Sequence, residues 1–198
     1  MRRFFVSRDV GLSECFFEYF QERNDYGMET AYYLNKFQKI ADDLDPKHFS
    51  EKKLESKVGI WLHSVALKVQ KRSWINASHL ARPFEESIFF SAWVNDESTR
   101  TGKLYYNIHA LKLRQLTGYK IKSREFATAF RMRFKAFEMK WPNVRLDLGP
   151  LTLMEGWVVL DEEHLAAIVK DLTYNFSAIA FIIDELLEER KRPVELAK

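Results

Sequence analysis

The sequence predicts a single α+β domain, and three observations lead to this prediction. Apolar residues recur at helical spacing near both ends of the chain, β-forming runs occupy its middle, and short loops separate those runs. Loops of hairpin length favour antiparallel pairing between neighbouring strands. The chain has 198 residues, of which 46% are hydrophobic, so it can bury a sizeable core.

The expected layout follows the positions of these patterns along residues 1–198. Residues 1–72 should be mainly helical. Residues 73–160 should hold a central antiparallel sheet of about four to six strands, with a basic amphipathic helix inserted over residues 123–140. A long C-terminal helix within residues 161–192 should pack on the sheet together with the basic helix.

Three apolar stripes support the helical N-terminal part. The first lies within residues 12–20. The second lies within residues 33–44 and should stop there, because the residue before Pro46 disfavours the helical backbone. The third covers residues 50–70 and also has the helical period. Within it, residues 58–70 partly alternate as a strand does, so a helix is expected there with a strand as the alternative.

The middle of the chain is rich in β-forming residues. Residues 87–94 read SIFFSAWV, which is typical of a strand buried on both faces. Residues 95–102 supply a polar loop. Residues 103–116 alternate, with a change of phase at Leu111 that a β-bulge would produce. Further extended segments are expected over residues 119–122, 144–148 and 151–160.

Residues 123–140 should form a helix that Ser123 caps and that stops before Pro142. Its large aromatic side chains share one face, which should anchor it in the core: Phe126, Phe130, Phe134, Phe137 and Trp141. The opposite face carries three cations, Arg124, Arg131 and Lys135.

The last helix should begin at Asp161, a good N-cap residue, and should carry a continuous apolar stripe over residues 165–187. Apolar side chains also lie away from that stripe, where a surface helix is normally polar. Tyr174, Phe181 and Ile182 therefore indicate one of two things. Either the helix is buried on two sides, or these residues form a contact in a homodimer.

Charge is unevenly distributed along the chain. The net charge of +3 conceals twelve basic and two acidic residues over residues 100–145, followed by five basic and eleven acidic residues over 146–198. Helix donors and cations of the basic segment could together hold a phosphate backbone. The candidate nucleic-acid-binding residues are Lys112, Arg114, Lys120, Lys122, Arg124, Arg131 and Lys135. The alternative is that the acidic last helix neutralises the basic segment within the fold.

Signals for catalysis are weak. His109 lies on an expected strand beside the basic segment, where it could act as a general acid or base. The favoured interpretation is a histidine on the sheet surface that only forms hydrogen bonds. The five histidines and the single Cys15 show no zinc-ligand spacing, so no metal site is expected. The seven glycines form no G-x-G pattern, which argues against a glycine-rich phosphate loop, and no cofactor is expected.

Three functional hypotheses follow from these patterns. The first is a non-catalytic protein that associates with nucleic acid or another polyanion through residues 100–145. The second is a ligand-binding or homo-oligomeric assembly protein with an aromatic pocket. The third is an enzyme with its site near His109. A cytoplasmic location is expected and a membrane role is not, because no apolar run approaches about 20 residues.

Overall fold

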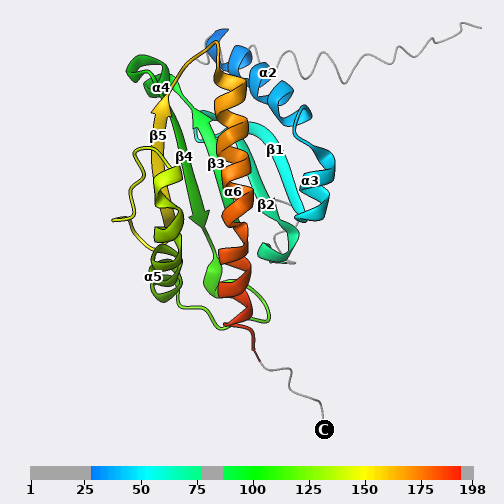
Figure 1. The fold of residues 1–198 in the computed structure, drawn as a ribbon, viewed down its shortest axis with the longest axis vertical. Helices are drawn as coiled ribbons and strands as arrows, with labels where there is room; N and C mark the ends of the chain where they lie inside the picture. Colours follow the sequence, from blue (N-terminus) through cyan, green and yellow to red (C-terminus); the bar gives the residue numbers. More distant parts are fainter. Residues whose placement is uncertain (1–27, 77–86, 193–198) are drawn as a thin grey trace, which may run out of the picture.

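The computed structural model describes residues 28–76 and 87–192, and it confirms the α+β class (Figure 1). Five antiparallel strands lie in chain order, β1-β2-β3-β4-β5, so each strand pairs with its neighbours in the sequence. Helices α2, α5 and α6 cover one face of this sheet, with α6 between the other two (Figure 1). The expected helix within residues 12–20 lies outside the described residues.

The helices and strands have the following bounds. The helices are α2 (Met28–Asp42), α3 (Pro46–Glu51), α4 (Asp96–Thr101), α5 (Ser123–Phe134) and α6 (Leu165–Glu188). The strands are β1 (Leu54–Trp61), β2 (Ser64–Lys71), β3 (Ile88–Val94), β4 (Lys103–Ala110) and β5 (Thr152–Val159). Short 3-10 helices span Arg72–Trp74, Leu113–Gln115 and Lys135–Lys140.

The helix expected over residues 50–70 is wrong, because this segment forms the β1–β2 hairpin. Val65, Leu67 and Val69 are buried and alternate with Ala66, Lys68 and Gln70, which are also buried. Residues four positions apart lie on one face both in a strand and in a helix, so apolar residues such as Val65 and Val69 also match helical spacing. The strand alternative for residues 58–70 is the correct one.

The turn of this hairpin has an unusual composition. Leu62 and His63 both have positive φ, 49° and 62°, as a two-residue hairpin turn of the favoured twist requires. Asparagine and glycine adopt this backbone readily, whereas leucine does not. The Leu62 side chain is 95% exposed, so it gains no burial in return.

Replacing Leu62 by asparagine should therefore stabilise the protein by about 0.5–1 kcal/mol. The measurement is the free energy of unfolding in urea. Leu151→Asn is the matched control, because Leu151 is also exposed but is not among the residues with positive φ. An equal shift in both variants would mean that backbone strain at Leu62 is not the cause.

Two further expectations are corrected in the segment after β3. The expected loop over residues 95–102 contains the short helix α4, which a capping box between Asn95 and Ser98 begins and Gly102, at φ 63°, ends. The phase change at Leu111 is not a bulge within a longer strand. Strand β4 ends at Ala110, Lys112 turns the chain at φ 54°, and a 3-10 helix follows.

The other short extended segments are less regular than expected. Tyr119 makes a single β-bridge with Lys191, and Arg145 makes one with Glu155. Each of these bridges is isolated, so neither segment forms a regular strand. Strands β3 and β5, by contrast, lie where the sequence predicts strands over residues 87–94 and 151–160.

The core lies between the sheet and the helical layer. The aromatic face of α5 is buried as predicted, since Phe126, Phe130 and Phe134 have no exposed surface. Phe176 of α6 stacks on Phe90 of β3 with ring centroids 5.0 Å apart. These contacts fix α5 and α6 against the sheet, which in turn sets the position of every charged side chain that they carry.

Helix α6 is the longest of the described elements, with 24 residues. By length and hydropathy alone it is sufficient to cross a membrane, and half of its most apolar window is buried inside the protein. A central core helix of a protein has the same composition, because it is covered on several sides. The prediction that α6 begins at Asp161 is wrong, because the helix begins at Leu165 with His164 as its N-cap. The Asp161 carboxylate instead accepts hydrogen bonds from the backbone N–H groups of Glu163 and His164 in the turn before the helix.

Candidate nucleic-acid interface

Cations from three segments meet at one end of the molecule, the lower end in Figure 1, where α6 ends and α5 begins. The chain at residues 118–120 pairs with residues 190–192. The Lys120 N–H donates to the Arg190 carbonyl at 2.8 Å, and the Arg192 N–H donates to the Gly118 carbonyl at 2.8 Å. We call this cluster the basic end, and its members are Lys112, Arg114, Lys120, Lys122, Arg124, Lys191 and Arg192.

Five of these residues are predicted site residues, and the last two were missed. All seven are exposed. The alternation over residues 103–116 predicts that Lys112 and Arg114 lie on a strand, but they lie on the turn and 3-10 helix after β4. Lys191 and Arg192 belong to the basic end because their segment pairs with the backbone near Tyr119, about 70 residues earlier in the chain. The sequence carries no local signal for this pairing.

The charge of the basic end is only partly neutralised. Lys122 pairs with Glu125 at 2.8 Å and Lys191 pairs with Glu188 at 2.9 Å. The pairing with Glu188 raises the pKa of Lys191. Within the described residues, no carboxylate lies within ion-pair distance of Arg114, Lys120 or Arg124. Their charges are therefore available to an anionic partner.

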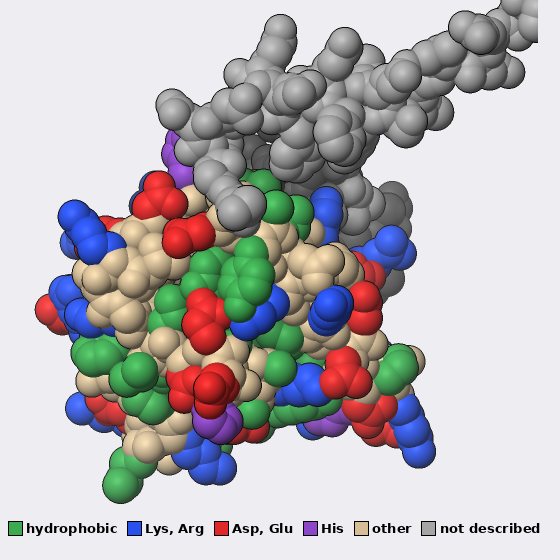
Figure 2. Space-filling view, turned by 90° about the horizontal axis from the view of Figure 1, so that it is seen from above, with side chains coloured by type: hydrophobic (Ala, Val, Ile, Leu, Met, Phe, Trp, Pro, Cys, Tyr) green, Lys and Arg blue, Asp and Glu red, His purple; other side chains and the backbone are tan. Residues whose placement is uncertain are grey.

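The opposite end of the molecule is different in character. Figure 2 shows that end, where α6 begins, with acidic and basic side chains intermingled around apolar patches. Charges of both signs in close proximity produce little net potential at a distance. The basic end is therefore the part of the described surface where basic side chains are gathered, as the uneven charge of the sequence predicts.

Arg131 is a predicted phosphate ligand that the structure places elsewhere. Its Nη2 donates to the carbonyls of Leu148, Gly149 and Thr152 at 2.8–3.0 Å, and its Nε donates to the Leu153 carbonyl at 3.1 Å. Burial lowers the pKa of the Arg131 guanidinium, an effect that the charge of Asp147 partly opposes. The side chain thus holds the turn before β5 against α5.

The remaining cations of α5 also lie away from the basic end. Lys135 is exposed on the 3-10 helix that continues α5, roughly 18 Å from the start of α5 at about 1.5 Å per residue. Arg133 pairs with Glu185 of α6, at 3.3 Å, and with Glu189, the residue that follows α6. The pairing lowers the pKa of Glu189. The basic and acidic segments therefore neutralise each other at Arg133 but not at the basic end.

His109 is half-buried on β4. Its Nδ1 lies 3.1 Å from the Thr152 hydroxyl and 3.3 Å from the Leu151 carbonyl. Burial lowers the pKa of His109, and the charge of Lys68 lowers it further, while the Leu151 carbonyl opposes this. In the part of the chain that is described, no carboxylate is hydrogen-bonded to this ring. The geometry is that of a histidine that links β4 to β5.

The three predicted oligomer contacts have different environments. Ile182 is only 1% exposed and belongs to the core, so it offers no outer surface. The Tyr174 hydroxyl accepts a hydrogen bond from the Asp45 N–H, and its ring packs against His48. Phe181 is 44% exposed and packs edge-on against Phe137 of the chain that follows α5.

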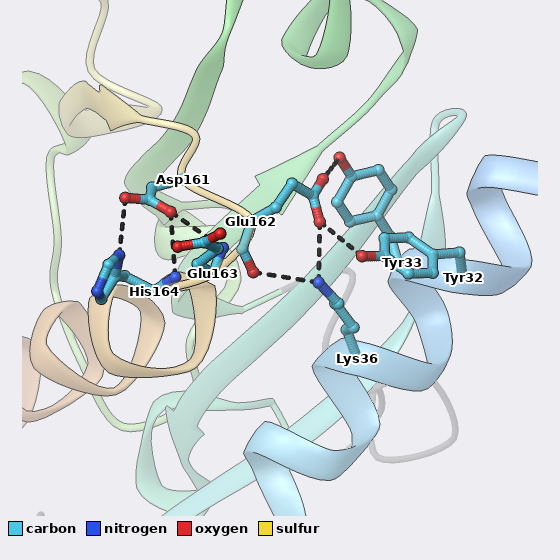
Figure 3. Close-up of polar contacts among 7 residues, drawn as sticks. All are labelled: Tyr32, Tyr33, Lys36, Asp161, Glu162, Glu163 and His164. Carbon is cyan, nitrogen blue, oxygen red and sulfur yellow. Dashed lines mark hydrogen bonds and ion pairs between the residues drawn. The ribbon is translucent and has the colours of Figure 1, made fainter.

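A polar cluster that the sequence did not indicate joins α2 to the segment before α6 (Figure 3). The Glu162 carboxylate accepts hydrogen bonds from Tyr32 at 2.8 Å, from Lys36 at 2.9 Å and from Tyr33. Burial alone would raise the pKa of Glu162, but these hydrogen bonds together lower it. Burial and the contact with Glu162 raise the pKa of Tyr33. One carboxylate thus ties two segments about 130 residues apart.

Replacing Glu162 by glutamine should lower the free energy of unfolding by about 1–2 kcal/mol near pH 7, because two tyrosines and Lys36 lose an anionic acceptor. The folded-state pKa of Glu162 is depressed, so its contribution is complete above the unfolded-state value of about 4.3. The contribution is then lost as the pH falls through the folded-state pKa. The difference between variant and wild type should accordingly shrink below about pH 4.

The measurement is urea unfolding at several pH values. Glu163→Gln is the matched control, since the Glu163 side chain makes no hydrogen bond within the described chain. A difference for Glu162→Gln that stays constant between pH 7 and acid would show that the ionised carboxylate is not the stabilising group.

The aromatic pocket of the second hypothesis is less well supported by the geometry. The large aromatic side chains of the core pack against one another and do not line the groove of about 330 Å³ between α2 and the start of α6. That groove is lined by lysines, carboxylates and aliphatic groups. Among residues 28–76 and 87–192, no group of three His, Cys, Asp or Glu side chains is arranged to hold a metal ion.

Comparisons with known proteins leave the site to be interpreted from this chain alone. No protein-family model, no curated protein and no solved structure matches the sequence or the fold.

Proposed function

We propose that this protein binds nucleic acid through the basic end. The observation that carries the proposal is the pairing of residues 118–120 with 190–192, which places two basic runs from distant parts of the sequence side by side. Seven exposed cations then share one end of the molecule, and among the described residues two of them, Lys122 and Lys191, are paired with carboxylates.

The physical reason is the electrostatics of a phosphate backbone. Exposed lysine and arginine side chains neutralise phosphates and release condensed counterions, and this release supplies most of the free energy of non-specific binding. Five of the seven cations have no carboxylate partner in the described part of the chain, so they lose no ion pair when they bind a phosphate: Lys112, Arg114, Lys120, Arg124 and Arg192. They are the residues that should contribute most.

A titration of a fluorescently labelled mixed-sequence oligonucleotide, followed by anisotropy, tests the proposal. Binding is expected at about 50 mM salt and should weaken steeply towards about 200 mM. An affinity that does not depend on salt, or no binding at low salt, would contradict it. The oligonucleotide should be offered both as a single strand and as a duplex, because the basic end alone does not distinguish them.

A further inference from the structure

The sheet has a second face, opposite the helical layer, on which no described helix packs (Figure 1). The strand pairing aligns side chains in rows across this face. One row is aromatic over the three last strands, because Trp93 pairs with Tyr105 and Tyr105 pairs with Trp157. We call Trp93, Tyr105 and Trp157 the aromatic row.

The aromatic row is preorganised and partly exposed. The rings of Trp93 and Tyr105 are stacked, with centroids 4.7 Å apart and planes 17° from parallel. Lys103 places its ammonium 4.3 Å from the centre of the Trp157 ring. All three aromatic side chains are half-buried, so each keeps part of its surface open to solvent.

The next row along the strands is polar and largely closed to solvent. Ser91 and Asn107 are hydrogen-bonded to each other at 2.6 Å, and both are at least 96% buried. Groups satisfied in this way cannot also read the edges of bases. A ligand on this face would therefore be held through its flat surfaces and its charge, with little dependence on sequence.

The charge beside the row favours an anionic ligand. Lys57 is exposed on this face and Lys103 lies against Trp157. Of the two glutamates on the face, Glu55 is paired with Arg72 at 3.2 Å. The Lys103 ammonium covers one face of the Trp157 ring, and Trp93 and Tyr105 cover one face of each other, so a base would stack on the remaining face of a ring, with a cation close to its phosphate.

We propose that the aromatic row stacks the bases of a single-stranded nucleic acid, and this inference rests on the function proposed for the basic end. Tyr105 of the row lies roughly 17 Å from Ala110, the last residue of β4, at about 3.3 Å per residue. The basic end begins at Lys112, two residues after Ala110. A single strand can lay its bases on the row while its phosphates contact the basic end. A duplex cannot, because its base faces are already stacked on one another.

The experiment compares three ligands on the full-length protein. These are an oligothymidine of about 15 nucleotides, an abasic oligomer of the same length and a duplex. Oligothymidine should quench the part of the tryptophan fluorescence that comes from Trp93 and Trp157, which are partly exposed. Trp61 is also partly exposed but lies outside the row, whereas Trp74 and Trp141 are 1% and 3% exposed. The abasic oligomer should bind without quenching and about tenfold more weakly than oligothymidine.

The variant Tyr105→Leu/Trp157→Leu should lose about tenfold or more in affinity for oligothymidine and keep its affinity for the abasic oligomer and the duplex. Phe181→Leu is the matched control, because Phe181 is an exposed aromatic residue on the helical side of the molecule. If the leucine variant fails to fold by circular dichroism, Tyr105→Phe/Trp157→Phe replaces it. This second pair should retain the affinity for oligothymidine while losing part of the quenching.

Each outcome is decisive for one of the two proposals. Equal affinity and equal quenching with oligothymidine and with the abasic oligomer would overturn base stacking while leaving the basic end in place. Failure of all three ligands to bind would overturn the proposed function itself. A wild-type dimer in light scattering that becomes a monomer in Tyr105→Leu/Trp157→Leu, with oligothymidine binding unchanged, would assign the row to contact with a second copy and overturn the inference.

Discussion

Replacing Arg131 by methionine should lower the free energy of unfolding by about 3 kcal/mol. One guanidinium donates to four backbone carbonyls, those of Leu148, Gly149, Thr152 and Leu153. Methionine fills much of the same space but leaves these carbonyls without their donor, and hydrogen bonds to a charged group are worth more than neutral ones. The turn before β5 should then lose its attachment to α5. Urea unfolding followed by circular dichroism measures the effect.

The control is Arg131→Lys, which keeps the charge but loses the planar fork of donors. It should recover only part of the lost stability. Under conditions where both variants are folded, their affinity for nucleic acid should remain within about twofold of wild type, because Arg131 is not at the basic end. If the Arg131→Met protein were as stable as the wild type but bound nucleic acid more weakly, Arg131 would contact the nucleic acid, and its structural role at the turn before β5 would be contradicted.

Replacing Arg114, Lys120 and Arg124 together by glutamate should lower the affinity for nucleic acid about a hundredfold or more at about 50 mM salt. Three cations without carboxylate partners are exchanged for three anions, so attraction to the phosphates becomes repulsion at the same positions. The three side chains are exposed, and the free energy of unfolding should change by only about 0.5 kcal/mol.

The matched control reverses three exposed lysines elsewhere, Lys47, Lys52 and Lys53. It changes the net charge of the protein by the same amount. Its affinity should fall much less, since only the long-range field is altered. Equal losses in the two variants would mean that net charge, rather than the basic end, governs binding.

The elements that could be predicted are those with one buried face. Helices α2, α5 and α6 each carry an apolar stripe against a polar surface, and this contrast has the period of the helix. Strand β3 was recognisable for a different reason, because residues 87–94 form a short uninterrupted run of β-forming residues.

The β1–β2 hairpin was missed because the contrast is absent there. Strand β2 is buried on both faces, and β1 is only half-buried along most of its length. The turn between them carries leucine and histidine where a turn signal would carry asparagine and glycine. The period of a strand is therefore only partly visible in the sequence, as the alternation within residues 58–70, and the usual turn signal is absent.

The candidate site was predictable only in part, for a related reason. Helical periodicity correctly places Arg131 away from the aromatic face of α5, but it carries no information about the carbonyls of residues 148–153 that approach this side. The contribution of Lys191 and Arg192 depends on one β-bridge between Tyr119 and Lys191. The aromatic row likewise depends on the register of three strands.

The most direct measurement is the salt dependence of duplex binding by the wild type and by Arg114→Ala/Lys120→Ala/Arg124→Ala. Each phosphate contact contributes about 0.9 to the slope of log K against log salt concentration, so losing three contacts should make the slope shallower by about 2.7. Such a difference would place these three cations on the phosphates. Identical slopes would contradict binding at the basic end, whatever the affinity of the wild type.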